Sequence, residues 1–247
     1  ISGLLSFAEK HMIRFYILPD FYRDIKKSMV MEIMEYVPLL SIRNEPLQSV
    51  SNRALKRAFD ILFSSLVLML VYPWLYVVIG TLIKLSSPGP VLFKQKRTGL
   101  YGKDFDCYKF RTMRVNKEAD EVQATRNDPR TTRIGAFLRH TNLDEMPQFV
   151  NVLKGDMSVV GPRPHMLKHT EQYSKLIDKY MVRHLVKPGI TGWAQITGYR
   201  GETKTLEQME GRVKRDVWYI ENWSFFLDLK IIYVTVINMF QGEKNAY

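Results

Sequence analysis

The most prominent pattern in the chain is an apolar run of 23 residues, 61–83, that contains no charged side chain. At about 1.5 Å per residue, a helix of this length is long enough to cross the hydrocarbon core of a bilayer. Pro73 lies near its middle, where it removes a helical hydrogen bond and bends the helix. Basic residues flank the run on both sides: Arg53, Lys56 and Arg57 before it, and Lys84, Lys94, Lys96 and Arg97 after it.

These flanks bear on the topology of the apolar run. Positive flanks favour the cytoplasmic face, so a straight span would leave one basic cluster on the wrong side. We therefore expect a re-entrant membrane helix over residues 51–86 that enters the bilayer, bends at Tyr72 and Pro73, and returns to the same side. A kinked transmembrane helix and a buried core helix are the alternatives. The run is not an N-terminal signal peptide, because about 60 residues precede it.

The rest of the chain combines short strand-like patterns with longer helical ones. Strands are predicted at residues 13–18, 37–40, 91–93 and 105–110. Helices are predicted at residues 132–141, 145–154, 168–182, 205–221 and 224–240. The predicted fold class is α/β, mostly helical α+β, in which a re-entrant membrane hairpin precedes a compact cytosolic domain with amphipathic interfacial helices.

Composition excludes several classes of protein. With 46% hydrophobic and 25% charged residues in a chain of 247, disordered and collagen-like proteins are excluded. Cys107 is the single cysteine, which excludes an intrachain disulfide and a cysteine-based zinc site, and fits a reducing, cytosol-facing location. Because the first residue is Ile1 and not methionine, we expect a piece of a longer chain.

The positive charge is concentrated in one segment. The chain has a formal net charge of +11, of which +8 falls within residues 51–115, around the apolar run. A basic patch alone fits nucleic acid, anionic lipid or phosphorylated substrates. No nucleic-acid partner is expected, because the basic residues bracket an apolar run instead of lining a polar face, and no nucleic-acid motif occurs.

Two adjacent carboxylates, Asp144 and Glu145, are the first candidates for chemistry. They lie at the start of the helix predicted at 145–154, with Asp144 at its N-cap and Gly155 closing its C-terminus. A helix N-terminus favours bound anions, so this end is a candidate phosphate site in which one carboxylate attacks and the other holds a metal. The alternative is that Asp144 is a plain helix cap.

Two arginines are candidates for phosphate contact. Arg163 lies between Pro162 and Pro164, which hold its backbone extended and stiff. A guanidinium held in place suits a two-point contact to phosphate. Arg139 lies five residues before Asp144 and can reach the same place from the preceding helix. The alternatives are a rigid loop with an exposed arginine for Arg163 and an ordinary surface charge for Arg139.

Other patterns are weaker. Asp104 and Asp106 fit the DxD pattern of nucleotide-sugar enzymes, but that pattern is short and the segment alternates like a strand. His165 and His169 have helical spacing, yet no Glu lies between them, so the HExxH zinc motif is not met. No glycine-rich phosphate loop of the Walker or Rossmann type occurs.

One long segment carries a resemblance to a known family. The string LDEMPQFVNVLKGDMSVVGPRP at 143–164 resembles the signature of the bacterial sugar transferases, monotopic polyprenyl-phosphate glycosyl-1-phosphate transferases. The resemblance covers about residues 51–247 and includes the basic-flanked apolar run, QKRTGLYGKDFDCYKFRTM at 95–113 and KPGITGWAQITG at 187–198. It implies three parts: the tail of a preceding Rossmann-like domain (1–50), a re-entrant membrane helix (51–86) and the catalytic domain (87–247).

The resemblance also implies a reaction. In this family, sugar 1-phosphate passes from a UDP-sugar to undecaprenyl phosphate with release of UMP, as the first membrane step of exopolysaccharide or O-antigen synthesis. By position, Asp144 matches the nucleophile that forms an aspartyl phosphosugar, and Glu145 matches its Mg²⁺-binding partner. Arg139 and Arg163 match phosphate-contacting positions. The family implies contact with membrane lipid at the cytoplasmic face of the bacterial inner membrane, and it allows a homo-oligomer.

One departure and two alternatives remain. The family often has Ser-Pro at the helix break, where this chain has Tyr72 and Pro73, so Ser64, Ser65 or water would bond the backbone that Pro73 leaves unpaired. Direct displacement with Asp144 as general base is an alternative to the covalent reaction. A basic membrane-anchored scaffold or nucleic-acid binder is the alternative to an enzyme. The sequence does not predict which sugar is transferred.

Overall fold

The computed structural model describes residues 30–34, 37–41, 45–115, 128–201, 203 and 205–241. The chain divides into two compact units, Ile1–Asn44 and Glu45–Tyr247. In the first unit, the described residues form an antiparallel pair of strands, β1 (Val30–Met34) and β2 (Val37–Ser41).

The second unit contains the other described elements. Its helices are α2 (Val50–Leu70), α3 (Tyr72–Ser86), α4 (Arg133–Thr141), α5 (Gln148–Lys154), α6 (Leu167–Leu176), α7 (Leu206–Glu221) and α8 (Phe225–Gln241). Its strands are β3 (Leu92–Thr98), β4 (Asp104–Phe110), β5 (Ser158–Val160) and β6 (Gly189–Thr191). Its 3-10 segments are η2 (Pro46–Gln48), η3 (Leu100–Gly102), η4 (Leu143–Glu145) and η5 (Tyr180–Leu185), and η6 (Gln195–Tyr199) is a short π-helix.

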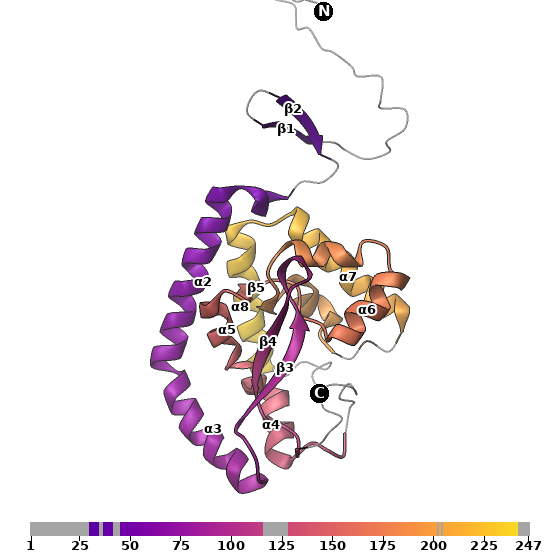
Figure 1. Ribbon diagram of the computed structural model, residues 1–247. Coiled ribbons are helices and arrows are strands. Elements are labelled where there is room, and N and C mark those ends of the chain that lie inside the picture. The colour runs from indigo at the N-terminus through magenta and orange to yellow at the C-terminus, as the bar shows by residue number, and fades with distance from the viewer. Residues whose placement is uncertain are drawn as a thin grey trace, which may run out of the picture. The chain divides into compact units, whose positions relative to one another are not determined.

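The second unit is a mostly helical α+β fold with small two-stranded sheets. Figure 1 shows α2 and α3 as a bent rod along one side of the unit, with the β3–β4 hairpin beside the inner helices. β3 and β4 pair antiparallel, and β5 and β6 pair parallel. A parallel pair needs a long crossover connection, which α6 and η5 supply here.

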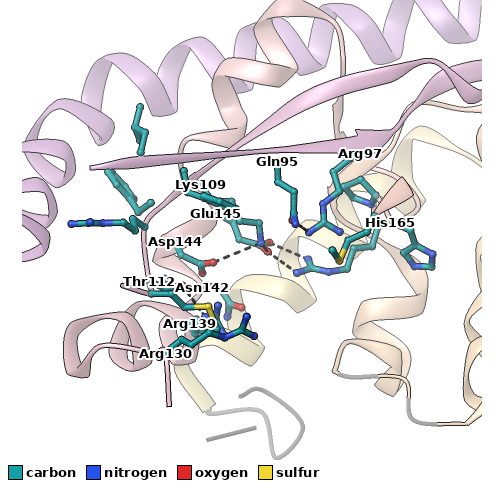
Figure 2. A pocket seen from close by; sticks show the side chains of 18 of the residues that line it. Gln95, Arg97, Lys109, Thr112, Arg130, Arg139, Asn142, Asp144, Glu145 and His165 are labelled. Atoms are coloured by element: carbon teal, nitrogen blue, oxygen red, sulfur yellow. Dashed lines mark hydrogen bonds and ion pairs between the residues drawn. The ribbon is translucent and has the colours of Figure 1, made fainter. Parts of the chain in front are cut away.

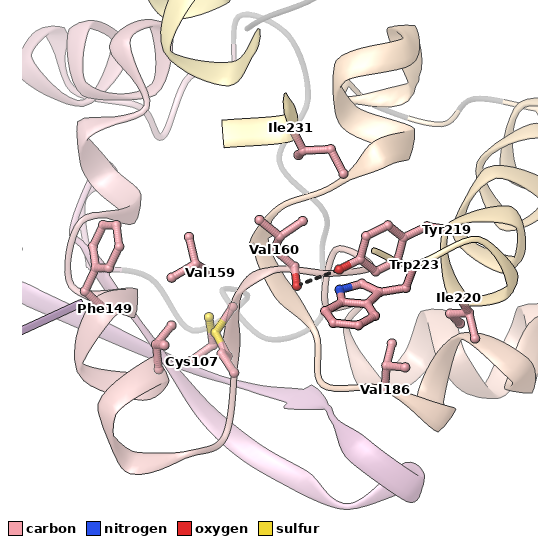
Figure 3. Close-up of a cluster of buried hydrophobic side chains, with 11 residues drawn as sticks. Cys107, Phe149, Val159, Val160, Val186, Tyr219, Ile220, Trp223 and Ile231 are labelled. Atoms are coloured by element: carbon pink, nitrogen blue, oxygen red, sulfur yellow. Dashed lines mark hydrogen bonds between the residues drawn. The ribbon is translucent and has the colours of Figure 1, made fainter. Parts of the chain in front are cut away.

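The main hydrophobic core lies where α5, β5, α7 and α8 meet. Val152, Ile220 and Ile231 are fully buried in it, and each such side chain stabilises the fold by about 1.5–3 kcal/mol. Figure 3 shows Tyr219 within this cluster, its hydroxyl 3.3 Å from the carbonyl oxygen of Val160. The helix that follows the Asp144–Glu145 pair and the strand that precedes Arg163 therefore pack in the same core.

Helix α2 has the reverse of the pattern expected for a soluble helix. Its buried residues are all polar, namely Lys56, Asp60 and Ser64. Its exposed side chains are apolar over most of its length, and include Leu55, Ile61, Leu62, Leu66, Met69 and Leu70. A contiguous apolar face of this kind marks a surface that contacts a partner or a membrane.

The polar face of α2, defined here as Lys56, Arg57, Asp60 and Ser64, is bonded to the rest of the unit. The Nζ atom of Lys56 forms a buried ion pair with Oδ2 of Asp228 on α8, at 2.6 Å. The Oδ1 atom of Asp60 accepts hydrogen bonds from two donors on β5, the hydroxyl of Ser158 at 3.0 Å and the amide of Val159 at 2.9 Å.

Arg57 extends this attachment to α5. Its two Nη atoms donate to the carbonyl oxygens of Val152 at 2.6 Å and Leu153 at 2.8 Å. These carbonyls lie in the last turn of α5, where a cation also interacts favourably with the helix dipole. The polar face of α2 thus contacts α5, β5 and α8 together.

The bend between α2 and α3 lies at the predicted position beside Tyr72 and Pro73. The two helices meet at 56°. The amide of Val71 donates to the carbonyl of Val67, and the amide of Leu75 donates to that of Val71, so backbone bonding continues on both sides of Pro73. Among the described helices, none is long and apolar enough to cross a bilayer alone, whereas α2 and α3 meet that criterion as a bent pair.

The expectation that Ser64 bonds the backbone at the break is wrong. Ser64 is fully buried seven residues before Val71, and its hydroxyl has no hydrogen-bond partner within the part of the chain that the structure describes. The break is instead supported by aromatic packing. The ring of Tyr72 stacks on that of Phe110 in β4, with 6.0 Å between centroids.

Most predicted elements are confirmed, and two are wrong in part. The helices α4, α7 and α8 agree with their predictions within one residue, and the strands predicted at 91–93 and 105–110 form the β3–β4 hairpin. The strand predicted at 37–40 is β2, and that at 13–18 lies outside the described residues. The helix predicted at 168–182 ends early, at Leu176, because the chain extends at Ile177 and turns at Lys179 with φ 63°. The helix predicted at 145–154 is treated with the site.

The buried ion pair between α2 and α8 gives a stability prediction. Asp228→Asn leaves the charge of Lys56 buried without its counter-charge, so it should destabilise the fold by about 3–5 kcal/mol. The control is Glu171→Gln, which removes a pair whose side chains are 75% and 73% exposed and should change stability by less than about 1 kcal/mol. Thermal unfolding in detergent measures both, and equal midpoints for the two variants would contradict the prediction.

Candidate active site

The Asp144–Glu145 pair lies in a tight turn between two helices. Helix α4 ends at Thr141, and its C-cap residue Asn142 adopts a left-handed conformation with φ 58°. The next three residues form the 3-10 turn η4, and α5 begins only at Gln148. The prediction that Asp144 caps a helix beginning at 145 is therefore wrong.

The backbone hydrogen bonds show how this segment departs from the predicted helix. Pro147 has no amide hydrogen, so the carbonyl of Leu143 cannot accept the α-type bond from residue 147. The amide of Met146 bonds that carbonyl instead, at 3.3 Å, in the 3-10 pattern. The C-terminal prediction is confirmed, since Gly155 closes α5 with φ 93°.

Both carboxylates are buried, at 7% exposure for Asp144 and 6% for Glu145, but their partners differ. Oε1 of Glu145 accepts from Nζ of Lys109 and from Nη2 of Arg163, each at 2.6 Å, and Oε2 accepts from Nη1 of Arg163 at 3.1 Å. Among the described residues, the ion pairs of Asp144 are limited to a 3.7 Å contact between its Oδ2 and Lys109. Glu145 is thus paired closely with two cations, whereas Asp144 has only the longer contact with Lys109 among the described residues.

A buried amide brings Lys109 to this pair. Asn151 of α5 is fully buried, and its side chain accepts from the amide of Tyr108 at 3.0 Å and donates to the carbonyl of Asp106 at 2.7 Å. These two bonds fix α5 against β4. Lys109, the next residue of β4, consequently faces Glu145.

The different partners separate the pKa values of the two carboxyl groups. Burial raises the pKa of Asp144, the charge of Lys109 opposes this rise, and the adjacent charge of Glu145 adds to it. Burial also opposes ionisation of Glu145, but the charges of Arg163 and Lys109 outweigh it and hold the pKa of Glu145 well below its usual range. Glu145 is a fixed anion, whereas the charge of Asp144 is poorly stabilised.

The pair faces a pocket of about 330 Å³ whose wall is strongly basic. Among the described residues, Asp144 and Glu145 are the two carboxylates in the wall. Nine basic side chains also line it, namely Arg97, Lys109, Arg111, Arg114, Arg130, Arg139, Arg163, Arg200 and Arg212. Such a wall suits a ligand with several negative charges. Figure 2 shows Asp144 close to Arg130 and Arg139 on one side of Glu145, and Gln95, Arg97 and His165 on the other.

The structure brings together the four side chains that the sequence singled out as catalytic or phosphate-binding. Asp144, Glu145, Arg139 and Arg163 all line this pocket. Arg139 is oriented by a 2.9 Å hydrogen bond from its Nε to the hydroxyl of Thr112. The membrane-break residues, Tyr72 and Pro73, lie outside it, at the junction of α2 and α3.

Sequence reasoning missed two groups in the wall. Lys109 was not singled out, although alternation in β4 places it next to the buried Phe110 at the end of a strand. His165 and His169 were set aside as lacking a zinc motif, but both line the pocket. Burial lowers the pKa of His165 well below its usual range, and the nearby charge of Arg183 lowers it further, so His165 is neutral.

Comparison with known proteins assigns the family. The family model of the bacterial sugar transferases matches residues 51–242, most of the chain. The chain belongs to the bacterial sugar transferase family. It is 53% identical over 94% of its length to a UDP-glucose:undecaprenyl-phosphate glucose-1-phosphate transferase of Escherichia coli, of which it covers 49%.

Two further relatives widen the comparison. A protein of the same name from Caulobacter vibrioides is 44% identical over 85% of the present chain and 78% of its own length. A third relative, from Aeromonas hydrophila, is named as a UDP-N-acetylgalactosamine-undecaprenyl-phosphate N-acetylgalactosaminephosphotransferase. It is 43% identical to the present chain, over 76% of this chain and 44% of the relative. The chain spans about half the length of several curated relatives that it matches.

The two carboxylates predict stability changes of opposite sign. The pKa of Asp144 is raised in the folded state, so folding favours the protonated carboxyl. The stability that this protonated form contributes is lost as pH rises through the raised pKa. Asp144→Asn removes the unfavourable charge and should raise Tm at neutral pH. The pKa of Glu145 is lowered, so its charge contributes stability above the ordinary glutamate range.

Glu145→Gln should accordingly lower Tm, because Arg163 and Lys109 lose their counter-charge at a cost of about 1–3 kcal/mol. Thermal unfolding of wild type and both variants between pH 4 and 8 (roughly the range in which buried carboxyls titrate) measures the two effects. The gain from Asp144→Asn should shrink toward acid pH. A loss of stability in both variants at neutral pH would contradict the opposed electrostatics.

Proposed function

We propose that the chain transfers a sugar 1-phosphate from a UDP-sugar to undecaprenyl phosphate and releases UMP, in exopolysaccharide synthesis. The observation that carries this proposal is the buried Asp144–Glu145 pair, held in a basic pocket beside an apolar helical surface. Membership of the family and the names of its relatives support it, and favour an enzyme over a basic scaffold or nucleic-acid binder. UDP-glucose is the first donor to test, because the relative at 53% identity is named for it.

The two carboxylates suit different roles in a two-step reaction. An oxygen of Asp144 attacks the sugar-bearing phosphorus, the phosphoanhydride bond breaks, and UMP leaves with the bonding electrons. An oxygen of undecaprenyl phosphate then attacks the same phosphorus and frees the Asp144 carboxylate. Asp144 fits this role because its charge is weakly paired, which leaves its oxygen nucleophilic.

Basic side chains around the pair neutralise the negative charge of the substrates. A diphosphate carries about two negative charges, so a carboxylate nucleophile is repelled unless cations neutralise the donor. Arg139 and Arg163 lie on either side of the pair, with Lys109 next to both carboxylates. These groups are already in place, so they stabilise the charge that develops on transfer without reorganising.

The donor atoms of the pair fit Mg²⁺ as a cofactor. Mg²⁺ is usually bound by one or two protein carboxylates and completed by substrate phosphates and water. Glu145 would hold the ion, since each carboxylate oxygen has two lone pairs and Oε2 accepts only the 3.1 Å bond from Arg163 among the described contacts. When bound, the ion would neutralise negative charge on the diphosphate.

We also propose that the apolar surface of α2, α3 and α8 lies in the inner membrane, with the pocket on its cytoplasmic face. Trp74, Val77 and Val78 on α3 and Phe226 and Tyr233 on α8 are exposed, continuing the apolar side of α2. The ring of Phe59 on α2 contacts that of Phe225 on α8, which makes the two helices neighbours. Such a surface holds the site at the level of a lipid-borne phosphate.

A burst experiment tests the covalent mechanism. With UDP-glucose and Mg²⁺ but without lipid acceptor, one equivalent of UMP should appear, and mass spectrometry should find a phosphosugar adduct on Asp144. Asp144→Asn should abolish both. Glu145→Gln should weaken the dependence on Mg²⁺ without moving the adduct. If UMP appears only when undecaprenyl phosphate is added and no adduct can be trapped, Asp144 acts as a general base in direct displacement.

Cysteine labelling tests the membrane topology. Because the basic flanks of α2 and α3 favour the same side, single cysteines at exposed positions near Ser51 and near Ser87, such as Ser51 itself and Ser86, should both react only from the cytoplasmic side when Cys107 is replaced by Ser. Pro73→Ala should straighten the bend and shift part of the population toward spanning. Labelling of one position from the periplasm in the wild-type background would identify a transmembrane helix instead.

A further inference from the structure

The backbone of Arg163 is held on every side that the structure describes. Before it, the amide of Gly161 donates to the carbonyl of Thr191 at 2.8 Å, and the amide of Gly189 donates to the carbonyl of Pro162 at 2.9 Å. The two glycines are in close contact, since a Cβ on Gly189 would lie 2.0 Å from the amide nitrogen of Gly161. After Arg163, the amide of Thr98 in β3 bonds the carbonyl of His165 at 3.2 Å, so both ends of the loop are fixed.

The carbonyl of Arg163 itself is bound by a second arginine. Nη2 of Arg183, in η5, donates to this oxygen at 2.6 Å and also to Oδ2 of Asp216 on α7 at 2.9 Å. Nη1 of Arg183 contacts Nδ1 of His165. Since an arginine can only donate, Nδ1 of His165 accepts, which agrees with a neutral imidazole. One buried guanidinium therefore holds two successive parts of the loop that carries Arg163.

The ion pair between Arg183 and Asp216 is deeply buried. The side chains of Arg183 and Asp216 are 1% and 3% exposed. The guanidinium also lies over the ring of Tyr180, 5.5 Å from its centroid. A buried ion pair is weak evidence for a stabilising role, because apolar side chains of the same size often serve stability as well or better. Its planar donors are, however, suited to fixing an orientation.

We propose that Arg183, held by Asp216, is a positioning residue that aims the guanidinium of Arg163 at Glu145 and at the donor phosphates. The inference rests on the proposed function. Arg183 touches neither carboxylate of the pair among the described contacts, so it acts through the carbonyl of Arg163. Lysine cannot replace it, because three donors on one nitrogen do not reproduce the spread of two nitrogens over Asp216, His165 and the Arg163 carbonyl.

A double-mutant cycle on turnover tests the proposal in the full chain in detergent. Arg163→Lys should lower kcat about ten- to a hundred-fold. Arg183→Lys should lower kcat about three- to tenfold with a KM for UDP-glucose changed less than about twofold, because misorientation affects the transition state more than binding. In the Arg163→Lys background, Arg183→Lys should lower kcat by less than about twofold, since the group that it positions is already gone.

The matched control is Arg57→Lys. Arg57 also donates two hydrogen bonds to backbone carbonyls, but in α5 and outside the pocket. Any effect of Arg57→Lys on kcat should be the same with and without Arg163→Lys. If Arg183→Lys behaves like this control, lowering kcat by the same factor in both backgrounds, Arg183 supports only the fold and the proposal is overturned.

A second readout separates this proposal from the proposed function. Phenylglyoxal modifies accessible arginines, and peptide mass spectrometry can follow Arg163 alone. Modification of Arg163 should speed up severalfold in Arg183→Lys and stay unchanged in Arg57→Lys, whether or not UDP-glucose is a substrate. An unchanged rate in Arg183→Lys would overturn the positioning role even if UMP is released as proposed. If Arg183→Lys does not fold, Asp216→Asn, which keeps shape and loses the counter-charge, replaces it in both measurements.

Discussion

The attachment of the polar face of α2 to the catalytic unit is the constraint on which the rest of the structure depends. Asp60 bonds β5, whose chain continues into the loop of Arg163. Arg57 bonds the end of α5, the helix that follows the carboxylate pair. The helix that presents an apolar surface on its outer side therefore also bonds, on its inner side, to α5 and to β5, the two segments next to the site in the chain.

The 3-10 turn explains how neighbouring residues come to differ in electrostatic character. With three residues per turn, successive side chains point about 120° apart, so Asp144 and Glu145 face different neighbours. Glu145 points between Arg163 and Lys109, and Asp144 toward the pocket beside Arg139. Because Pro147 has no amide hydrogen, the carbonyl of Leu143 accepts from the amide of Met146 instead, in the 3-10 pattern.

Local patterns were sufficient to predict most of the elements, and tertiary contacts explain where they failed. The helices α4, α7 and α8 follow from apolar periodicity, and the β3–β4 hairpin from alternation around two glycines. Asp144 and Glu145 could be found because they are adjacent carboxylates, and Arg163 because a proline lies on each side of it. Lys109 and Arg183 could not be found in this way. Their roles depend on Asn151 joining α5 to β4 and on η5 meeting α7, contacts between residues 33–45 positions apart.

The polar face of α2 also has a consequence for the order in which the protein is made. The partners of this face lie far downstream, 98 residues away for Ser158 and Asp60 and 172 residues away for Asp228 and Lys56. While the ribosome is still producing those segments, Lys56 and Asp60 can interact only with each other, with water or with lipid headgroups. An early insertion of α2 into lipid would bury both charges without the hydrogen bonds and the ion pair of the finished fold, at a cost of several kcal/mol. With the membrane placement proposed above, biogenesis favours a late entry of α2 into the membrane, after the C-terminal helix that carries Asp228 has been made.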